Sequence, residues 1–221
     1  MVVGELPESV DFLVVGGGPG GYVAAIVAAQ LGRTVVLVDR DGEAGLGGVC
    51  VNVGCIPSKA LIEVAGVAHG VAAWADRGVT GLGPVGVDLA AFQTWKNQVV
   101  GSLNGGVRQL LKAAGVDVRQ GHFRFTRKDQ GALDLGTDQL PVHLKFASCV
   151  IATGSRPAPL TGLARDGVRI LDSTDVLALR EVPQRVVVVG GGYIGIELGT
   201  ALSKCGSTVT LVEAHLESAV P

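Results

Sequence analysis

Hydrophobic and polar positions divide this chain into short apolar runs separated by longer helical stretches. Short runs rich in apolar residues stand at 11–15, 34–38 and 148–151, and runs of this kind are typical of buried parallel strands. Val116 to Arg119 is interpreted as a further parallel strand. The Ala-rich stretch from Tyr22 to Leu31 has the composition of a helix. The pattern predicts an α/β fold with a parallel sheet covered by helices, preceded by a short tail over residues 1–10.

Two further helices are expected between the second and third strands. The first should run from about Cys50 to Val67, followed by a Gly-rich, loop-like stretch from Trp74 to Gly86. Asp88 is a plausible N-cap for a second helix that reaches about Ala114. Glycines at 101, 105 and 106 weaken this helix locally.

Short alternating runs follow the third strand, at Phe123–Phe125, Leu133–Leu135 and Val142–Phe146. Turn residues such as 129–131 and 136–138 separate them. The runs predict a three-stranded β-meander that covers one face of the sheet.

A glycine-rich loop joins the first strand to the first helix. Gly16, Gly18 and Gly21 satisfy the GxGxxG pattern, Gly32 ends the helix, and Asp39 closes the second strand. Glycines permit a tight turn and close backbone approach, so that N–H groups at the helix start can hold a pyrophosphate. The acid, about twenty residues further on, can accept hydrogen bonds from a ribose.

The stretch from Arg185 to Glu213 repeats this βαβ pattern. The same offset of 174 residues separates Gly16 from Gly190 and Asp39 from Glu213. Two such loops predict two bound nucleotides. The Glu213 charge would repel a 2′-phosphate, and residues 214–216 supply no Arg for one, so NAD is favoured over NADP. Between the two patterns, residues 157–181 read as a connector with a short helix around Thr174–Leu179.

Composition and charge narrow the class of protein. The net charge of −2 over 221 residues shows no electrostatic footprint for nucleic acid. The run from Phe12 to Leu31 is apolar enough to imitate a membrane span, but its glycines and Pro19 fit a phosphate loop better than a lipid-facing helix. Without a targeting segment, we expect a cytoplasmic protein and no membrane partner. The four histidines offer no metal-ligand spacing, so no metal site is expected: His69, His122, His143 and His215.

Two cysteines carry the candidate chemistry. Cys50 and Cys55 are followed by Pro57 and by helix formers, so the pair should lie at the start of a helix. Unpaired backbone N–H groups favour a thiolate there. Cys149 and Cys205 are interpreted as apolar core residues of a strand and a helix.

The stretch Gly47–Lys59, with the pattern Gly-Gly-x-Cys-x-Asn-x-Gly-Cys-x-Pro-Ser-Lys, resembles the redox-active disulfide motif of the flavin-dependent pyridine nucleotide–disulfide oxidoreductases. Within that family it is most similar to dihydrolipoamide dehydrogenases. Residues 152–157 resemble the family's hinge between flavin and nicotinamide domains. The sequence departs from the family at Val49, usually Thr, and at Asp39, more often Glu.

The resemblance implies an FAD-dependent dithiol–disulfide oxidoreductase that converts dihydrolipoamide and NAD⁺ to lipoamide and NADH. Cys50 would be the interchange sulfur and Cys55 would face the flavin. Lys59 and Glu197 would form an ion pair beside it, and Tyr193 would screen it. The implied catalytic residues are Cys50, Cys55, Lys59 and Glu197. The implied cofactor-binding residues are Gly16, Gly18, Pro19, Gly20, Gly21, Asp39, Arg40, Gly48, Val49, Gly54, Lys59, Gly121, His122, Ala152, Thr153, Gly154, Gly190, Gly192, Tyr193, Ile194, Gly195, Glu197 and Glu213.

The resemblance also implies a domain organisation. Residues 1–155 would form an FAD-binding domain with the redox disulfide, 156–184 a connector, and 185–221 the first βαβ unit of an incomplete NAD-binding domain. It covers only the N-terminal half of a family member. The family's second flavin segment, and the dimerisation domain with its His–Glu base, have no match in this sequence. A full-length form would be a homodimer acting on lipoyl groups of 2-oxoacid dehydrogenase or glycine cleavage complexes.

Three alternatives stay open. Glutathione reductases share the disulfide but tend to have Pro-Lys-Lys where this chain has Pro57-Ser58-Lys59. Mercuric reductases share Pro-Ser-Lys, but their additional metal-binding thiols have no match here. A nucleotide-binding module without turnover is the third, because the base and the subunit interface are missing.

Overall fold

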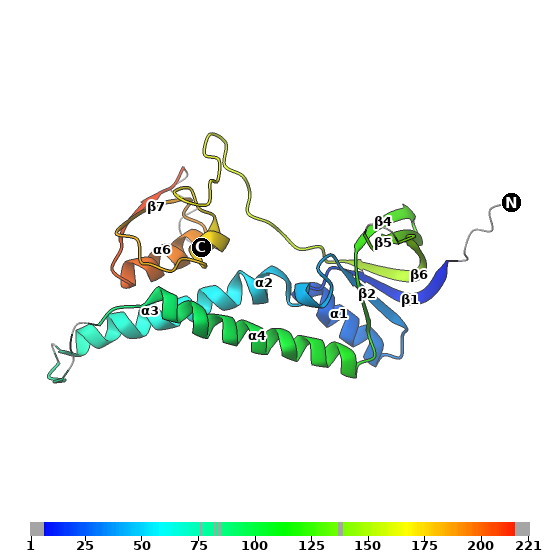
Figure 1. Cartoon of the computed structure of the whole chain (residues 1–221), viewed down its shortest axis with the longest axis horizontal. Coiled ribbons are helices and arrows are strands. Elements are labelled where there is room, and N and C mark those ends of the chain that lie inside the picture. Colours follow the sequence, from blue (N-terminus) through cyan, green and yellow to red (C-terminus); the bar gives the residue numbers. More distant parts are fainter. Residues whose placement is uncertain (1–6, 76, 82, 84, 137–138, 215–221) are drawn as a thin grey trace. The chain divides into compact units, whose positions relative to one another are not determined.

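The computed structural model describes residues 7–75, 77–81, 83, 85–136 and 139–214 (Figure 1). Two compact units are present, one formed by residues 1–52 and 101–155 and the other by residues 53–100 and 156–221. His215, Leu216 and the predicted turn residues 137–138 lie outside the described residues. The functional domain boundaries at 155 and 184 remain predictions.

The first unit is built on one mixed sheet of six strands, in the order β3-β2-β1-β6-β5-β4. The four strands β1, β2, β3 and β6 pair in parallel, whereas β4 and β5 are antiparallel to their neighbours. The strands are β1 (Glu8–Val15), β2 (Val35–Asp39), β3 (Asp117–Gln120), β4 (His122–Arg127), β5 (Gln130–Asp134) and β6 (Val142–Ile151).

Two apolar cores lie on opposite faces of the parallel strands. On one face, Val14 and Leu37 pack against Ala25 and Ala28 of α1 (Pro19–Gln30). On the other, Val36 and Val38 pack with residues of β5 and β6. Alternate residues of a strand point to opposite faces, which gives the three layers. The α/β fold with helices, parallel sheet and meander is therefore confirmed, and Figure 1 shows β4 and β5 above β6 and β1.

Two strand predictions were too short. The predicted runs 142–146 and 148–151 form the single strand β6, because β1 pairs with both, through Val10 with Phe146 and Phe12 with Ser148. β1 itself begins at Glu8, since the ladder extends to Leu144.

The prediction of one redox helix from Cys50 to Val67 was wrong. The structure has a short helix α2 (Gly48–Asn52) and a long helix α3 (Cys55–Ala75). The Asn52 amide donates to the Gly48 carbonyl at 3.0 Å, and Gly54 disfavours continuation. Pro57 is tolerated because its missing N–H falls in the first turn of α3. Among the described residues, one helical stretch, Gly48–Val71, is long and apolar enough to cross a membrane. Core helices of soluble proteins meet the same criterion, so this is weak evidence.

The predicted cap of the next helix is confirmed. Asp88 accepts a hydrogen bond from the Ala91 N–H at 3.0 Å and precedes α4 (Leu89–Ala113). The helix continues through its three glycines, with its inward face buried at both Asn104 and Val107, because packing outweighs weak local propensity. The division between the two units falls within α4.

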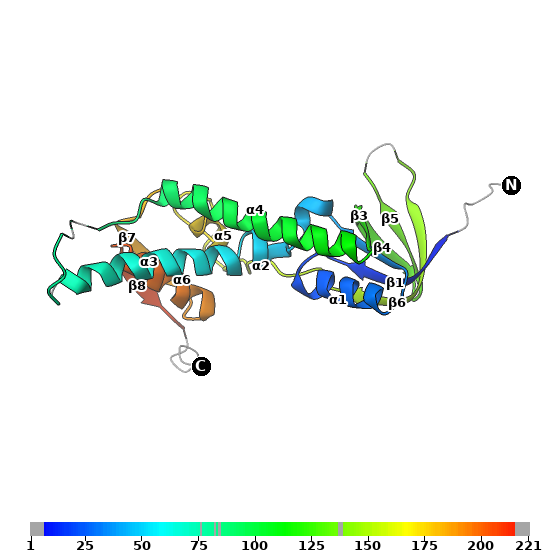
Figure 2. The same cartoon turned by 90° about the horizontal axis from the view of Figure 1, so that it is seen from below.

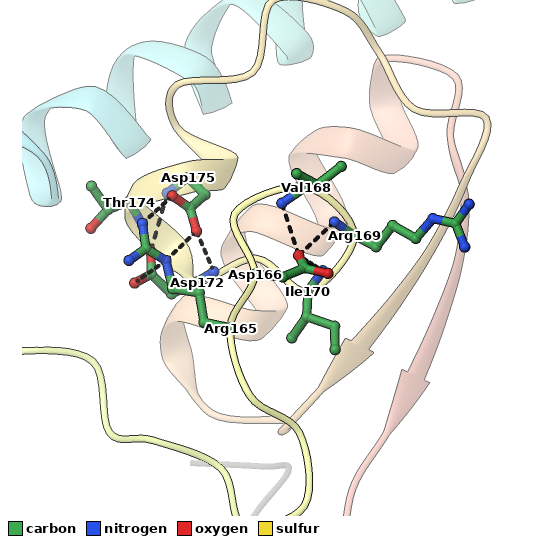
Figure 3. A network of polar contacts seen from close by, with 8 residues as sticks. All are labelled: Arg165, Asp166, Val168, Arg169, Ile170, Asp172, Thr174 and Asp175. Carbon is green, nitrogen blue, oxygen red and sulfur yellow. Dashed lines mark hydrogen bonds and ion pairs between the residues drawn. The ribbon is translucent and has the colours of Figure 1, made fainter.

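The connector in the second unit is held by side-chain hydrogen bonds. Helix α5 (Ser173–Val176) is shorter than predicted and starts with a capping box of Asp172 and Asp175. Arg165 binds the Asp175 carboxylate through two nitrogens, each at 2.6 Å, as Figure 3 shows. Gln93 donates to the Leu177 carbonyl at 3.0 Å, which ties the connector to α4.

The second βαβ pattern forms as predicted, with β7 (Arg185–Val189), α6 (Tyr193–Lys204) and β8 (Thr208–Val212). The two strands pair in parallel, with Val188 opposite Leu211. Leu198 and Ala201 of α6 are buried in a core with residues of α3 and α4, and Figure 2 shows α6 beside α3. Val187 and Val189 on the sheet remain 64% and 51% exposed.

Candidate functional site

The first glycine loop has a backbone geometry that demands glycine. Gly16 has φ of +105° and donates to the Val38 carbonyl at 2.7 Å. A Cβ at Gly21 would collide with the carbonyl oxygen of Gly16, and a Cβ at Gly16 would collide with that of Ala152. Gly18 is the N-cap of α1 and Pro19, which has no N–H, follows it. The Gly18 carbonyl accepts from the N–H groups of Gly21 and Tyr22, each at 2.9 Å.

The acid at the end of β2 closes this loop. The Asp39 carboxylate accepts from the Gly17 N–H at 2.7 Å and from the Asp41 N–H at 2.9 Å. The backbone carbonyl of Asp39 accepts from the Gly121 N–H at 3.0 Å. Each carboxylate oxygen has a second lone pair, so hydrogen bonding to a ribose remains compatible with these contacts.

The Cys50 helix lies against the same loop. The Gly47 N–H donates to the Gly17 carbonyl at 2.9 Å, and a Cβ at Gly48 would lie 2.7 Å from the Gly18 Cα. Cys50 follows in α2 and is half-buried, while Val49 is 46% exposed. The first unit therefore brings the helix that contains Cys50 against the first glycine loop.

Other predicted residues of the first unit lie at the same sheet edge with fewer contacts. Ala152 donates to the Val15 carbonyl at 2.8 Å, and Thr153 adjoins the space beside Gly16. Gly20 approaches the Ala152 side chain. Arg40 is exposed and pairs with Asp41 at 3.1 Å. The remaining residues, His122 and Gly154, are exposed, and their cofactor roles remain predictions.

In the second unit, Cys55 is the first residue of α3 and is exposed. Gly54 precedes it, and the Gly54 carbonyl accepts from the Ser58 N–H at 2.9 Å. Lys59 lies one turn further along and donates to both carboxylate oxygens of Glu197, at 2.7 and 2.8 Å. The predicted Lys59–Glu197 ion pair is therefore confirmed, whereas its place beside a flavin remains a prediction.

The second glycine loop repeats the first. Gly190 has φ of +106°, and the Gly191 N–H donates to the Glu213 carboxylate at 2.5 Å. Gly192 caps α6, and a Cβ at Gly195 would collide with the Gly190 oxygen. At the helix start, Tyr193 and Ile194 are 77% and 61% exposed.

Two other cysteines lie away from the candidate site residues. Cys149 lies on β6 and Cys205 ends α6, and burial raises the pKa of both thiols. Their inertness remains a prediction. Within the described ranges, no group of three or more His, Cys, Asp or Glu side chains could hold a metal ion.

Sequence reasoning missed the residues that hold the Cys50 segment. Asn104 of α4 is only 9% exposed and donates to the Leu46 carbonyl at 2.6 Å. Asn52 donates to the same carbonyl at 2.9 Å. The available signal was the position of Asn104 on the helical stripe formed by residues 89, 93, 96, 100, 104, 107 and 111.

These loops fit dinucleotides, since each has a positive-φ glycine, a helix start and a carboxylate held at the loop. The family model described as pyridine nucleotide-disulphide oxidoreductase matches residues 10–218. The chain belongs to this family.

Relatives give a narrower likeness. The chain is 46% identical over 216 residues to dihydrolipoyl dehydrogenase 2 of Haloarcula marismortui and 46% identical over 213 residues to dihydrolipoyl dehydrogenase of Bacillus subtilis. Each match covers 96% of this chain and 44% of the relative. The chain thus spans less than half the length of these curated relatives.

Solved structures agree with the fold. LpdA from Mycobacterium tuberculosis matches with a TM-score of 0.81 and 26% identity, over 93% of this chain and 45% of that one. The HOCl-induced flavoprotein disulfide reductase RclA from Escherichia coli matches with a TM-score of 0.74 and 28% identity, over 93% of this chain and 42% of that one. These likenesses confirm the resemblance inferred from the cysteine motif.

Proposed function

We propose that this chain supplies the FAD-binding and dithiol part of a dihydrolipoyl dehydrogenase. The overall reaction would be dihydrolipoamide plus NAD⁺ to lipoamide, NADH and a proton. The observation that carries this proposal is the Lys59–Glu197 ion pair at 2.7 Å. The ion pair connects α3, whose first residue is Cys55, with α6, which follows the second glycine loop. The segment that would carry a thiol and the segment that would bind the nicotinamide nucleotide thus share one charged contact.

The sulfur chemistry would proceed by two exchange steps. A substrate thiolate attacks the Cys50 sulfur of a Cys50–Cys55 disulfide, and Cys55 leaves as a thiolate. The second substrate thiol then attacks its own sulfur in the mixed disulfide, releasing lipoamide and the Cys50 thiol. The position of Cys55 at the start of α3 favours its thiolate, because N-terminal N–H groups and the helix dipole stabilise negative charge.

The two loops would hold the nucleotides that complete the reaction. Bound FAD would supply a two-electron carrier between the thiols and the nicotinamide. Gly16–Gly21 and the start of α1 would face one pyrophosphate, and Gly190–Gly195 with α6 the other. Asp39 and Glu213 would accept from ribose hydroxyls, and the Glu213 charge favours NAD over NADP. Tyr193, one turn before Glu197 on α6, would cover the nicotinamide position.

We further propose that the physiological partners are protein-bound lipoyl groups in the cytoplasm, and that a full-length form is a homodimer. The 46% identity to dihydrolipoyl dehydrogenases favours this substrate over mercuric ions or glutathione disulfide. A second candidate is a nucleotide-binding fragment without turnover, which is favoured by the two glycine loops because their geometry does not involve the cysteines.

A reconstitution experiment separates the two candidates. The chain is titrated with FAD, freed of unbound flavin, and assayed for oxidation of NADH by lipoamide, alone and with the C-terminal part of the Bacillus subtilis relative. Saturable flavin binding with turnover abolished by Cys50→Ser or Cys55→Ser supports the oxidoreductase. Cys149→Ser and Cys205→Ser serve as controls that keep activity. Flavin binding without turnover in either mixture supports the fragment, and no flavin binding contradicts both.

A further inference from the structure

Two asparagine side chains hold the short helix α2, which contains Cys50, through hydrogen bonds. Asn52, its last residue, donates to the carbonyl of Leu46 at 2.9 Å and to that of Gly48 at 3.0 Å. Asn104 reaches the same place from α4, donating to the Leu46 carbonyl at 2.6 Å and to the Asn52 oxygen at 3.3 Å. Leu46 is fully buried, so this shared acceptor is fixed in the core.

The outer end of this network is charged. Arg108, one turn along α4, donates to the Asn104 oxygen at 3.4 Å and pairs with Glu43 at 3.0 Å. Asn104 therefore uses both ends of its amide. A buried amide leaves its partners unsatisfied when it is removed, which is more costly than losing an exposed contact.

We propose that Asn104 is a positioning residue that fixes the Cys50 sulfur by holding both ends of α2. Cys50 lies two residues after Gly48 and two before Asn52, and therefore between the two groups to which Asn104 donates, the Leu46 carbonyl and the Asn52 side chain. A helix of five residues has too few internal hydrogen bonds to be stable alone, so its position depends on these side chains. The proposal rests on the proposed function only in taking Cys50 as the reacting sulfur.

The test compares how fast the two thiols react. The reduced full chain is pulsed with N-ethylmaleimide, and tandem mass spectrometry locates the label on Cys50 or Cys55 in their common peptide. Because Cys50 is half-buried and Cys55 exposed, loosening α2 should raise the labelling of Cys50 relative to Cys55. For Asn104→Leu we expect a rise of about fivefold, the change that loss of one buried hydrogen bond makes in a local opening equilibrium.

Gln93→Leu is the matched control. Gln93 lies on the same inward stripe of α4, is 7% exposed, and donates to the carbonyls of Leu177 and Leu179. Its loss should lower thermal stability by a similar amount and leave the labelling ratio unchanged. If Asn104→Leu also leaves the ratio unchanged, Asn104 is merely structural and the proposal is wrong.

Asn104→Asp provides a second variant that keeps the side-chain shape and carries the test if the leucine variant does not fold. Its carboxylate cannot donate to Leu46 or Asn52, whereas its protonated form can. The labelling ratio, measured with an activated disulfide that reacts in acid, should be raised at neutral pH and fall toward wild type as pH is lowered. A pH-independent ratio equal to wild type contradicts the proposal. A raised ratio in a chain that shows no lipoamide turnover, either alone or with the C-terminal part of the relative, would refute the proposed function and leave the positioning role intact.

Discussion

The two βαβ motifs of this chain have nearly the same local geometry. The first glycine has φ of +105° in one and +106° in the other, and both helix caps have φ of −71°. In each, a carboxylate at the end of the second strand accepts from the N–H of the middle glycine: Asp39 accepts from Gly17 and Glu213 from Gly191. Local sequence alone is therefore sufficient to set the loop.

Their surroundings differ. Leu13 of the first motif is fully buried, whereas Val187 at the equivalent position of the second is 64% exposed. A Cβ at Gly16 would meet Ala152, but a Cβ at Gly190 would meet no described atom within 4 Å. The first motif has strands on both sides of β1, whereas the described part of the second has only the pair β7–β8.

The second motif is instead buried through its helix. Leu198 and Ala201 of α6 are 6% and 1% exposed and pack with residues of α3, α4 and the connector. The outward face of α1 in the first motif stays open, with Val23 and Val27 about half exposed at 49% and 48%. Two loops of the same geometry thus differ in what is buried around them. In the first motif the strand residue Leu13 is buried, whereas in the second it is the helix residues Leu198 and Ala201.

The largest effect should come from truncating the equivalent sheet residues. Leu13→Ala should lower the free energy of unfolding by about 3 to 4 kcal/mol, because it leaves a cavity in a closed core. Val187→Ala should cost less than about 0.5 kcal/mol, because an exposed valine loses little burial. Urea denaturation followed by circular dichroism measures both. Equal losses would show that the open face of β7–β8 is buried in solution.

The next largest difference between the two motifs should come from replacing with alanine the helix glycine that lies against the carbonyl oxygen of the loop's first glycine. In Gly21→Ala the new methyl group collides with Gly16, whose own position is blocked by Ala152, and we expect a loss of about 3 kcal/mol. In Gly195→Ala the methyl group also collides with the Gly190 oxygen, but a Cβ at Gly190 would meet no described atom within 4 Å. The second loop therefore has more room to adjust, and a loss of about 1 kcal/mol is expected.

Hydrogen exchange of the α1 and α6 amides, measured by mass spectrometry, checks this pair. Gly32→Ala is unsuitable as a control because Gly32 has φ of +80°, whereas Gly66 of α3 has open space around its Cβ position. Gly66→Ala should be neutral or stabilising, since alanine favours a helix by up to about 1 kcal/mol over glycine. A larger loss of unfolding free energy for Gly195→Ala than for Gly21→Ala would contradict the view that the first loop is the more closely packed of the two.

Much of this fold was predictable because the information is local. Glycine loops, strand periodicity and the Asp88 cap each depend on a few neighbouring residues, and the structure confirms them. Element ends were less predictable, because they depend on distant partners. β6 is one strand because β1 pairs with it on both sides of Ala147, from Leu144 to Ile151, and the redox helix breaks where the Asn52 side chain donates back to the Gly48 carbonyl.

The site shows the same division. The cysteine motif and both loops could be recognised from spacing, and the family resemblance supplied the Lys59–Glu197 pair across 138 residues. The Asn104 contact with Leu46 spans 58 residues. The helical stripe indicates that Asn104 faces inward, but it does not identify Leu46 as the partner.

The Lys59–Glu197 pair offers a smaller, electrostatic test. The first motif has Val23 at the position equivalent to Glu197, so Glu197→Val makes the second helix resemble the first there. Because Lys59 is 59% exposed and Glu197 is 30% exposed, the loss in unfolding free energy should be below about 1 kcal/mol. Urea titrations at low salt and in 1 M NaCl should show the difference from wild type shrinking with salt. A loss that is independent of salt would indicate packing rather than charge.

The smallest effect concerns the connector that leads into the second motif. Arg165 lowers the pKa of Asp175 to about 2, from an ordinary value of 3.8, by hydrogen bonding to its carboxylate. A lowered pKa in the folded state stabilises the connector above about pH 4, and this stabilisation is lost as pH falls through about 2. Arg165→Gln should return the pKa of Asp175 toward its ordinary value, as measured by carboxyl ¹³C NMR titration.

Asp166 is the matched control in the same network (Figure 3). Its pKa is lowered by backbone N–H groups of residues 168–170 rather than by Arg165, each donating at 2.8 Å. Arg165→Gln should therefore leave the Asp166 titration unchanged. If both carboxyls shift together, Arg165 organises the whole connector, and the second motif depends on this loop as well as on α3 and α4 for the burial of its helix.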